Sequence, residues 1–132
     1  MTPATELWVR KAENDLQFAS SIPLSRHSYD GICFHCQQCV EKYLKGLMVE
    51  ANLTFPKTHD LDRLLSLVVA THPSLRSFRR AMLFLTTFAV ETRYSGYNAK
   101  RRQAAAALRW AERVRQECRT LLGIKPPRKK SP

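Results

Sequence analysis

Glycine is scarce in this chain, and the short motifs that usually announce a catalytic or phosphate-binding loop are absent. Only four glycines occur in 132 residues. No glycine-rich phosphate loop, no G-x-S-x-G nucleophile elbow and no H-E-x-x-H zinc motif is present. The sequence therefore gives no sign of phosphate-loop, serine-hydrolase or zinc-protease chemistry.

Long hydrophobic runs are also missing. No apolar run approaches the roughly 20 residues that a membrane helix needs, and the N-terminal residues lack the apolar core of a signal peptide. We expect a cytoplasmic protein without membrane association. A length of 132 residues fits one domain with a real core.

Acidic residues are rare in the last third of the chain. Residues 98–132 contain 11 Lys and Arg but only two acids, Glu112 and Glu117, whereas residues 1–97 contain 11 Lys and Arg and nine acids. The net charge of +11 is therefore concentrated near the C-terminus. This asymmetry suggests a polyanionic partner, either RNA, DNA or an acidic protein. The alternative is a solvated basic face that keeps the protein soluble.

Helix-forming residues dominate, and apolar positions recur every three or four residues. The pattern predicts five helices, over residues 5–20, 28–51, 58–72, 74–93 and 98–122. We expect an all-α, antiparallel up-and-down helical bundle in which helices two to five form a four-helix core and the first is a packing helix. The bundle would occupy residues 1–122, and the basic, proline-rich residues 123–132 would form a flexible tail.

The predicted buried faces follow from this spacing, and the fifth helix has two distinct sides. The residues expected in the core of the five helices are Trp8, Ala12, Leu16 and Ala19; Ile32, Cys36, Val40, Leu44 and Leu47; Leu61, Leu64, Leu65 and Val68; Phe78, Met82, Leu85, Phe88 and Ala89; and Ala104, Ala107, Ala111, Val114, Cys118 and Leu121. Arg102, Arg109 and Arg113 fall on the opposite side of the fifth helix and predict a cationic stripe.

Three cysteines in the segment CFHCQQC have a spacing that is also found in metal and iron–sulfur sites. They are Cys33, Cys36 and Cys39, with His35 between them. On a continuous helix the three thiols stay on the apolar side, where a free cysteine packs as a small hydrophobic residue. We therefore expect core packing, with no metal and no cofactor.

Histidine spacing does not indicate a metal site either. No two histidines have the i, i+4 spacing of a helical zinc site. His59 stands beside Thr58, the expected N-cap of the third helix, and can fix that loop against a neighbouring helix.

Four blocks in a fixed order resemble the HEPN family, the higher eukaryotes and prokaryotes nucleotide-binding domain. The first block is W-x-x-K-A-x-x-D-L from Trp8 to Leu16, and the second is F-H-C-Q-Q-C-V-E-K-Y-L-K from Phe34 to Lys45. K-T-H-D-L follows at residues 57–61 and T-R-Y at residues 92–94. The resemblance covers about residues 5–122.

The resemblance implies a helical bundle that pairs as a homodimer. Many prokaryotic HEPN proteins are associated with a minimal nucleotidyltransferase, and some of these pairs act as toxin–antitoxin systems. Many members are metal-independent ribonucleases whose motif is an Arg followed, after four to six intervening residues, by a His.

Arg93 matches the Arg of that motif, but no His follows it. Asn98 stands within the window and cannot exchange a proton, and Tyr97 has an ordinary pKa of about 10. A proton carrier near neutral pH is normally His. A ribonuclease would need a variant site in which His59 or His27 approaches Arg93.

A binding site around Arg93 is the other interpretation. Arg offers a planar fork of donors for phosphate, and neighbouring tyrosines offer rings for a base. The N-terminus of the fifth helix favours an anion. The residues proposed on this basis are Arg93, Tyr94, Tyr97, Asn98, Lys100, Arg101 and Arg102, together with His59, Lys42 and Lys45. The simpler alternative is that Arg93 pairs with Glu41 or Glu91.

Three hypotheses of function follow. The first is a non-catalytic HEPN subunit that dimerises and binds a nucleotidyltransferase partner, a nucleotide, or both. The second is a metal-independent ribonuclease toxin with a variant site built on Arg93. The third is simple RNA binding through the cationic fifth helix.

Overall fold

Five α-helices and one short 3₁₀ helix make up the part of the chain that the computed structural model describes, residues 1–89 and 98–126. In chain order they are α1 (Pro3–Ser21), α2 (Tyr29–Glu50), α3 (Leu61–Val68), η1 (Pro73–Phe78), α4 (Arg79–Thr86) and α6 (Arg101–Leu121). Within these residues there is no strand. The predicted all-α helical bundle is confirmed.

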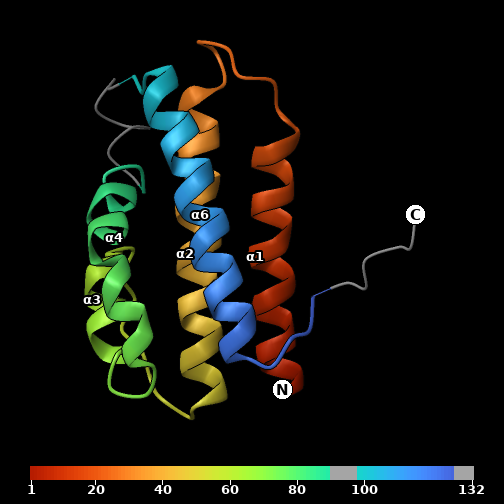
Figure 1. Cartoon of the computed structure of the whole chain (residues 1–132), viewed down its shortest axis with the longest axis vertical. Helices are drawn as coiled ribbons and strands as arrows, with labels where there is room; N and C mark the ends of the chain where they lie inside the picture. Colours follow the sequence, from red (N-terminus) through yellow and green to blue (C-terminus); the bar gives the residue numbers. More distant parts are fainter. Residues whose placement is uncertain (90–97, 127–132) are drawn as a thin grey trace.

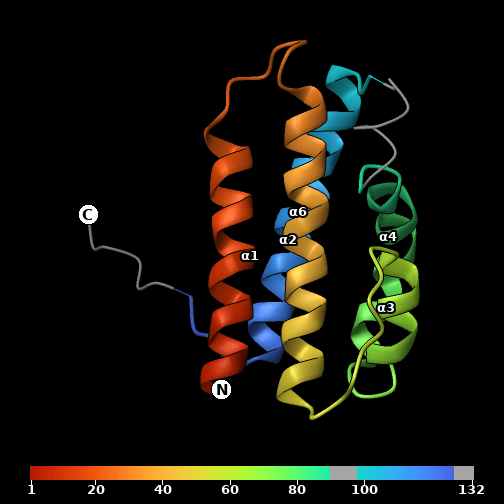
Figure 2. The ribbon, with the colours of Figure 1, turned by 180° about the vertical axis from the view of Figure 1, so that it is seen from behind.

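The three long helices form one side of the bundle, and the short helices complete it along α2. Figure 1 shows α6 lying across the front of α1 and α2, with α3 and α4 to one side. Figure 2 shows α1 and α2 side by side on the face turned away from α6. The first helix, expected as a packing helix, packs along most of the length of α2. None of the described helices is long and apolar enough to cross a membrane.

Small side chains let α6 lie close to its neighbours. Ala104, Ala107, Ala111, Val114 and Cys118 are fully buried, as predicted. The predicted core residues of α2 and α3 are buried as well. Trp8, Phe78 and Leu121, which were also predicted to lie in the core, are only partly buried.

An ion network between the long helices fixes their relative positions. Glu13 of α1 accepts hydrogen bonds from Arg115 at 2.7 and 2.8 Å and from Arg119 at 3.2 Å, both on α6. Tyr43 of α2 donates to the same carboxylate at 2.7 Å. Burial acts to raise the pKa of Glu13, but the hydrogen bonds from Arg115 and Tyr43 outweigh it and hold that pKa below its ordinary value.

The ends of α2 and α6 have backbone geometry that stops a helix. Asn52 has a φ of 56°, and Leu53 N donates to Met48 O at 2.8 Å. Gly123 has a φ of 74°, and Ile124 N donates to Arg119 O at 2.9 Å. Both are left-handed C-terminal caps, a conformation that Gly and Asn adopt most readily.

The boundaries predicted for the third and fourth helices were wrong, and the third covers Leu61–Val68 rather than residues 58–72. The third helix is capped by Asp60, whose carboxylate accepts from the N–H groups of Asp62 and Arg63, rather than by Thr58. The predicted fourth helix is divided, with a 3₁₀ turn before α4, and α4 ends at Thr86. The hydroxyls of Thr86 and Thr87 donate to carbonyls three or four residues back, and such side-chain bonds compete with a continuing helix.

Candidate functional site

The first two sequence blocks line one groove between α1 and α2, the two helices that lie side by side in Figure 2. The groove is open and has a volume of about 670 Å³. It is lined by Trp8, Lys11, Asn14, Asp15, Phe18, His35, Glu41, Lys42 and Lys45. Because residues three or four apart share a helix face, each of these two blocks places a row of side chains along the groove.

Asp15 organises one part of the groove. Its two carboxylate oxygens contact different side chains of α2, with His35 Nδ1 2.8 Å from Oδ1 and Lys42 Nζ bonded to Oδ2. The Asp15 side chain is only 11% exposed. The His35 ring lies against Phe18, with ring centroids 4.5 Å apart. Lys42, a predicted binding residue, therefore lies in the groove, but its charge is paired.

Glu41 is the second carboxylate in the groove, and it contacts three side chains. Its carboxylate lies 3.0 Å from Lys45 Nζ and 2.9 Å from His59 Nδ1, and it accepts from Gln37 Nε2 at 3.1 Å. Glu41, one of the two carboxylates considered as partners for Arg93, is thus bonded to other groups. Arg93 and Glu91 lie outside the described residues. The predicted role of His59, fixing its loop against a neighbouring helix, is confirmed.

An aromatic ring with two nearby ammonium groups completes the groove. Lys11 Nζ lies 5.7 Å and Lys45 Nζ 5.9 Å from the centre of the Trp8 ring. Phe55 packs edge-on against Trp8, with ring centroids 5.9 Å apart. Ring and cations together offer a surface for a base and donors for phosphate. Sequence reasoning missed Lys11, Asp15 and His35 as site residues, although they lie in the blocks and on the helical stripes that it identified.

The rest of the predicted set lies at the beginning of α6. Asn98, Lys100, Arg101 and Arg102 are exposed there. Ala99 N donates to the Asp30 carboxylate, and Lys100 N donates to Gln103 Oε1 at 2.8 Å, so two backbone donors near this helix end already have acceptors. Arg93, Tyr94 and Tyr97 lie outside the described residues.

The structure therefore divides the described members of the predicted site into two groups. Lys42, Lys45 and His59 meet at the groove, whereas the cations of α6 lie near Asp30, in the first turn of α2. Asp30 and Glu41 are eleven residues apart on one helix, a distance of roughly 16 Å.

The cysteines belong to the core. Cys33, Cys36, Cys39 and Cys118 are buried and carry free thiols, as the packing interpretation predicted. Burial raises the pKa of the Cys33 thiol to about 12 and also raises the pKa of the other three. Over residues 1–89 and 98–126, no group of three or more His, Cys, Asp or Glu side chains is arranged to hold a metal ion.

Comparisons with known proteins agree with the fold and with the sequence blocks. The family model described as "HEPN domain" matches residues 5–121. The crystal structure of TT1696 from Thermus thermophilus superposes with a TM-score of 0.76 at 22% identity, covering 90% of this chain and 98% of the other. That of ST0689, described as an archaeal HEPN homologue, superposes with a TM-score of 0.67 at 25% identity, covering 89% and 97%.

No curated protein matches the chain. The family model spans all the described helices apart from the first residues of α1, and it includes the two blocks that line the groove and the third block, whose His59 contacts Glu41. The chain belongs to the HEPN domain family.

Proposed function

We propose that this HEPN domain is a non-catalytic subunit that binds a nucleotide or RNA, dimerises, and pairs with a minimal nucleotidyltransferase in a toxin–antitoxin-like module. The observation that carries the binding role is that two sequence blocks line the α1–α2 groove and that His59 of the third block contacts Glu41 there. The dimer and the nucleotidyltransferase partner are expectations from the family.

The groove has the chemistry that a nucleotide needs. Trp8 offers a partly exposed ring for the base, and Lys11 and Lys45 stand within 6 Å of the centre of that ring. A phosphate that enters the groove can take hydrogen bonds from these ammonium groups. Asp15 and Glu41 pair with Lys42 and Lys45, so Lys11, which forms no ion pair within the described residues, is the cation that remains for a phosphate.

The absence of a motif His supports a role without catalysis. Asn98 stands where a His would follow Arg93 after four intervening residues, and no His occurs after His72. An amide cannot accept and return a proton near neutral pH, so the general acid–base step of a ribonuclease lacks its usual group.

Calorimetric titration with ATP tests the binding role. Trp8→Phe and Lys11→Gln should each weaken binding about tenfold, because a stacking ring or a phosphate donor is lost. The matched controls are Trp110→Phe, in α6, and Arg10→Gln, an exposed cation beside Lys11. Wild-type protein that takes up neither ATP nor RNA would disprove the proposal.

A ribonuclease toxin with a variant site is the second candidate, and the position of His59 favours it. Its Nδ1 lies 2.9 Å from Glu41, and its side chain is 58% exposed. A His oriented by a carboxylate and open to solvent is suited to proton transfer. Leu61 N, two residues after His59, donates to Thr86 Oγ1 at 3.0 Å, which holds the beginning of α3 against the end of α4.

Labelled total RNA incubated with the protein in EDTA separates the two candidates. Intact RNA supports the binding subunit. Cleavage by the wild type that is lost in both Arg93→Ala and His59→Asn would instead establish the ribonuclease, with His59 as the replacement proton carrier.

A further inference from the structure

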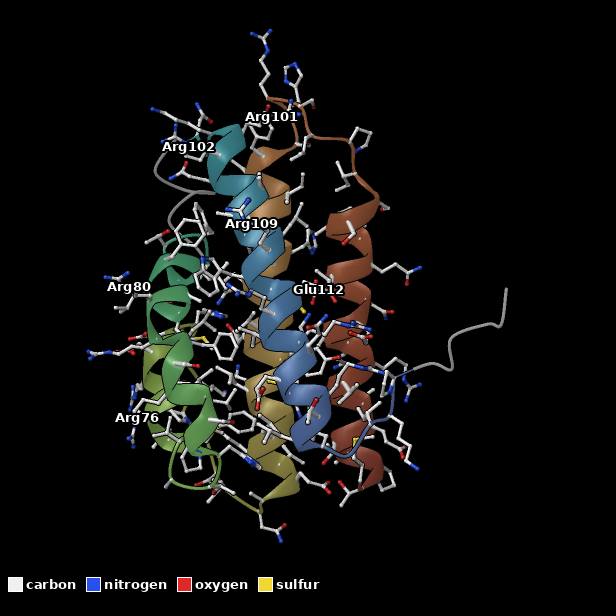
Figure 3. All side chains as sticks on the ribbon, in the orientation of Figure 1. Arg76, Arg80, Arg101, Arg102, Arg109 and Glu112 are labelled. Carbon is white, nitrogen blue, oxygen red and sulfur yellow. The ribbon has the colours of Figure 1, made fainter. Side chains whose placement is uncertain are left out.

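Six arginines cover one face of the bundle that the groove does not use. They are Arg76 in η1, Arg80 in α4, and Arg101, Arg102, Arg109 and Arg113 in α6, and we refer to them as the arginine face. Figure 3 labels five of them: Arg76 and Arg80 extend from the edge formed by η1 and α4, and Arg101, Arg102 and Arg109 lie along the N-terminal half of α6. All six are exposed.

Within the described residues, the arginines of this face outnumber the carboxylates near it. Residues 73–89 contain no Asp or Glu. The two acids of α6 are bonded to other groups, Glu112 to Arg115 at 3.0 Å and Glu117 to Ser74 Oγ at 2.8 Å, although Glu112 also lines a groove with Arg109 and Arg113. None of the six arginines forms an ion pair with a residue in 1–89 or 98–126. A surface on which guanidinium groups outnumber carboxylates is positively charged and attracts an anionic partner.

The face is built on a fixed support. The hydrogen bond from Ser74 to Glu117 joins η1 to α6. Phe78 and Trp110 pack edge to face, with ring centroids 6.5 Å apart. These two contacts hold η1, which carries Arg76, against the part of α6 that carries Arg109 and Arg113.

The shape of the face favours a phosphate backbone over exposed bases. Arg102, Arg109 and Arg113 extend over eleven residues of one helix, roughly 16 Å. Single-stranded nucleic acid is usually bound by aromatic rings on which bases stack. Here Trp110 is already engaged by Phe78 and by Arg113, which lies 5.4 Å from its ring centre. The adjoining open groove of about 560 Å³ is lined by Ser20, Leu108, Arg109, Glu112 and Arg113, with no aromatic residue.

We propose that the arginine face binds the phosphate backbone of double-stranded RNA. In a duplex the bases are stacked inside and the phosphates are outside, so a surface rich in guanidinium groups and poor in free rings matches it. Such binding is independent of base sequence, because phosphate contacts orient a protein without reading bases. This inference deepens the proposed function, because it assigns RNA to the arginine face and leaves the α1–α2 groove for a nucleotide.

Fluorescence anisotropy with a labelled 20-base-pair RNA duplex, over a series of KCl concentrations, tests the proposal. The variants are Arg109→Gln/Arg113→Gln and Arg76→Gln/Arg80→Gln. Each removes two positive charges, and Gln keeps a good helix propensity. The control Arg10→Gln/Arg63→Gln removes the same charge from exposed positions of α1 and α3. Circular dichroism verifies that each variant is folded.

We expect the wild type to bind with strong salt dependence. Each arginine-face variant should bind at least tenfold more weakly at low salt, and the slope of log K against log salt should become shallower by about 1 for each phosphate that the variant no longer neutralises. The control should bind like the wild type. Equal weakening in all three double variants would mean that only net charge matters and would overturn the proposal.

ATP titration of the same proteins separates failure of this inference from failure of the proposed function. Wild-type protein that binds ATP but not the duplex overturns the arginine-face proposal and leaves the groove intact. Protein that binds the duplex but not ATP rejects the groove and supports the arginine face. Binding of an acidic polypeptide, poly-glutamate, as tight as that of the duplex at the same salt would also overturn the RNA assignment.

Discussion

His59 Nδ1 and a carboxylate oxygen of Glu41 lie 2.9 Å apart, and this contact joins the segment after α2 to the middle of that helix. Gln37 Nε2 strengthens the junction by donating to the carbonyl of His59 at 3.1 Å. Glu41 also pairs with Lys45, and their side chains are only 5% and 11% exposed. One buried carboxylate thus positions both a groove lysine and the exposed histidine.

Removing the charge of Glu41 should destabilise the protein strongly. Glu41→Gln leaves the Lys45 ammonium buried without its counter-charge, and losing one member of such a pair costs about 3 kcal/mol. Urea denaturation measures the loss. The double variant Glu41→Gln/Lys45→Met should regain most of it, because no unpaired charge remains. Losses that simply add in the double variant would contradict the buried-pair interpretation.

Restoring the motif histidine should create a ribonuclease. Asn98 follows Arg93 after four intervening residues and is exposed just before α6. Asn98→His supplies a side chain that exchanges protons near neutral pH at the spacing the family motif implies. We expect labelled RNA to be cleaved in EDTA by this variant and to remain intact with the wild type.

Two further variants make that result interpretable. Asn98→Ala alters the same position without adding a proton carrier and should leave RNA intact. Arg93→Ala combined with Asn98→His should remove the new cleavage, because the motif needs both residues. A double variant that still cleaves would trace the activity to some other site.

The periodic pattern was sufficient to predict the bundle and most of its core. Ile32, Cys36, Val40 and Leu44 recur at helical spacing and are all fully buried. The spacing of apolar residues carries no information about the hydroxyl groups of Thr86 and Thr87. The predicted fourth helix therefore extended too far toward the C-terminus. Apolar periodicity does not detect such local competition between a side chain and the backbone.

The candidate site was only partly predictable, for a different reason. Lys42, Lys45 and His59 were identified from sequence blocks, and the structure brings them to one groove. Lys11 and His35 were not predicted as site residues. Their neighbours lie on the other helix, and these can be identified only when the packing of α1 against α2 is known. Asp15, which holds Lys42, is likewise recognisable only from that packing.

The Glu13 network should make stability depend on pH in the acid range. The pKa of Glu13 is lower in the folded chain than its ordinary value, because its hydrogen bonds from Arg115 and Tyr43 outweigh burial. The folded state therefore gains stability above the ordinary carboxylate pKa, and the gain is lost as pH falls through the lowered folded value. Glu13→Gln should cost about 1–3 kcal/mol at pH 7.

Urea denaturation between pH 7 and pH 3 checks this dependence. The wild type should lose more free energy of unfolding on acidification than Glu13→Gln, so their curves should converge at low pH. Arg109→Gln changes an exposed α6 arginine without an ion pair in the described residues and should follow the wild type. Parallel curves for the wild type and Glu13→Gln would show that Glu13 is not the group responsible.

Two glycines of α2 should respond oppositely to the same substitution. A Cβ added at Gly46 would lie 3.2 Å from Trp8 Cβ, at a close approach of α1 to α2. Because Trp8 Cβ is attached directly to the backbone, α1 must shift, and we expect Gly46→Ala to lose about 1–2 kcal/mol. At Gly31 nothing lies within 4 Å, so Gly31→Ala should gain about 0.5 kcal/mol from helix propensity.

The Gly46 variant also tests whether the groove depends on helix spacing. Trp8 carries the ring beside Lys11 and Lys45, so a shift of α1 changes those distances. ATP affinity should therefore fall in Gly46→Ala and stay unchanged in Gly31→Ala, when both are measured where the proteins are fully folded. Unchanged affinity in Gly46→Ala, together with the expected loss of stability, would mean that ligand binding does not require the Trp8 ring at its present position.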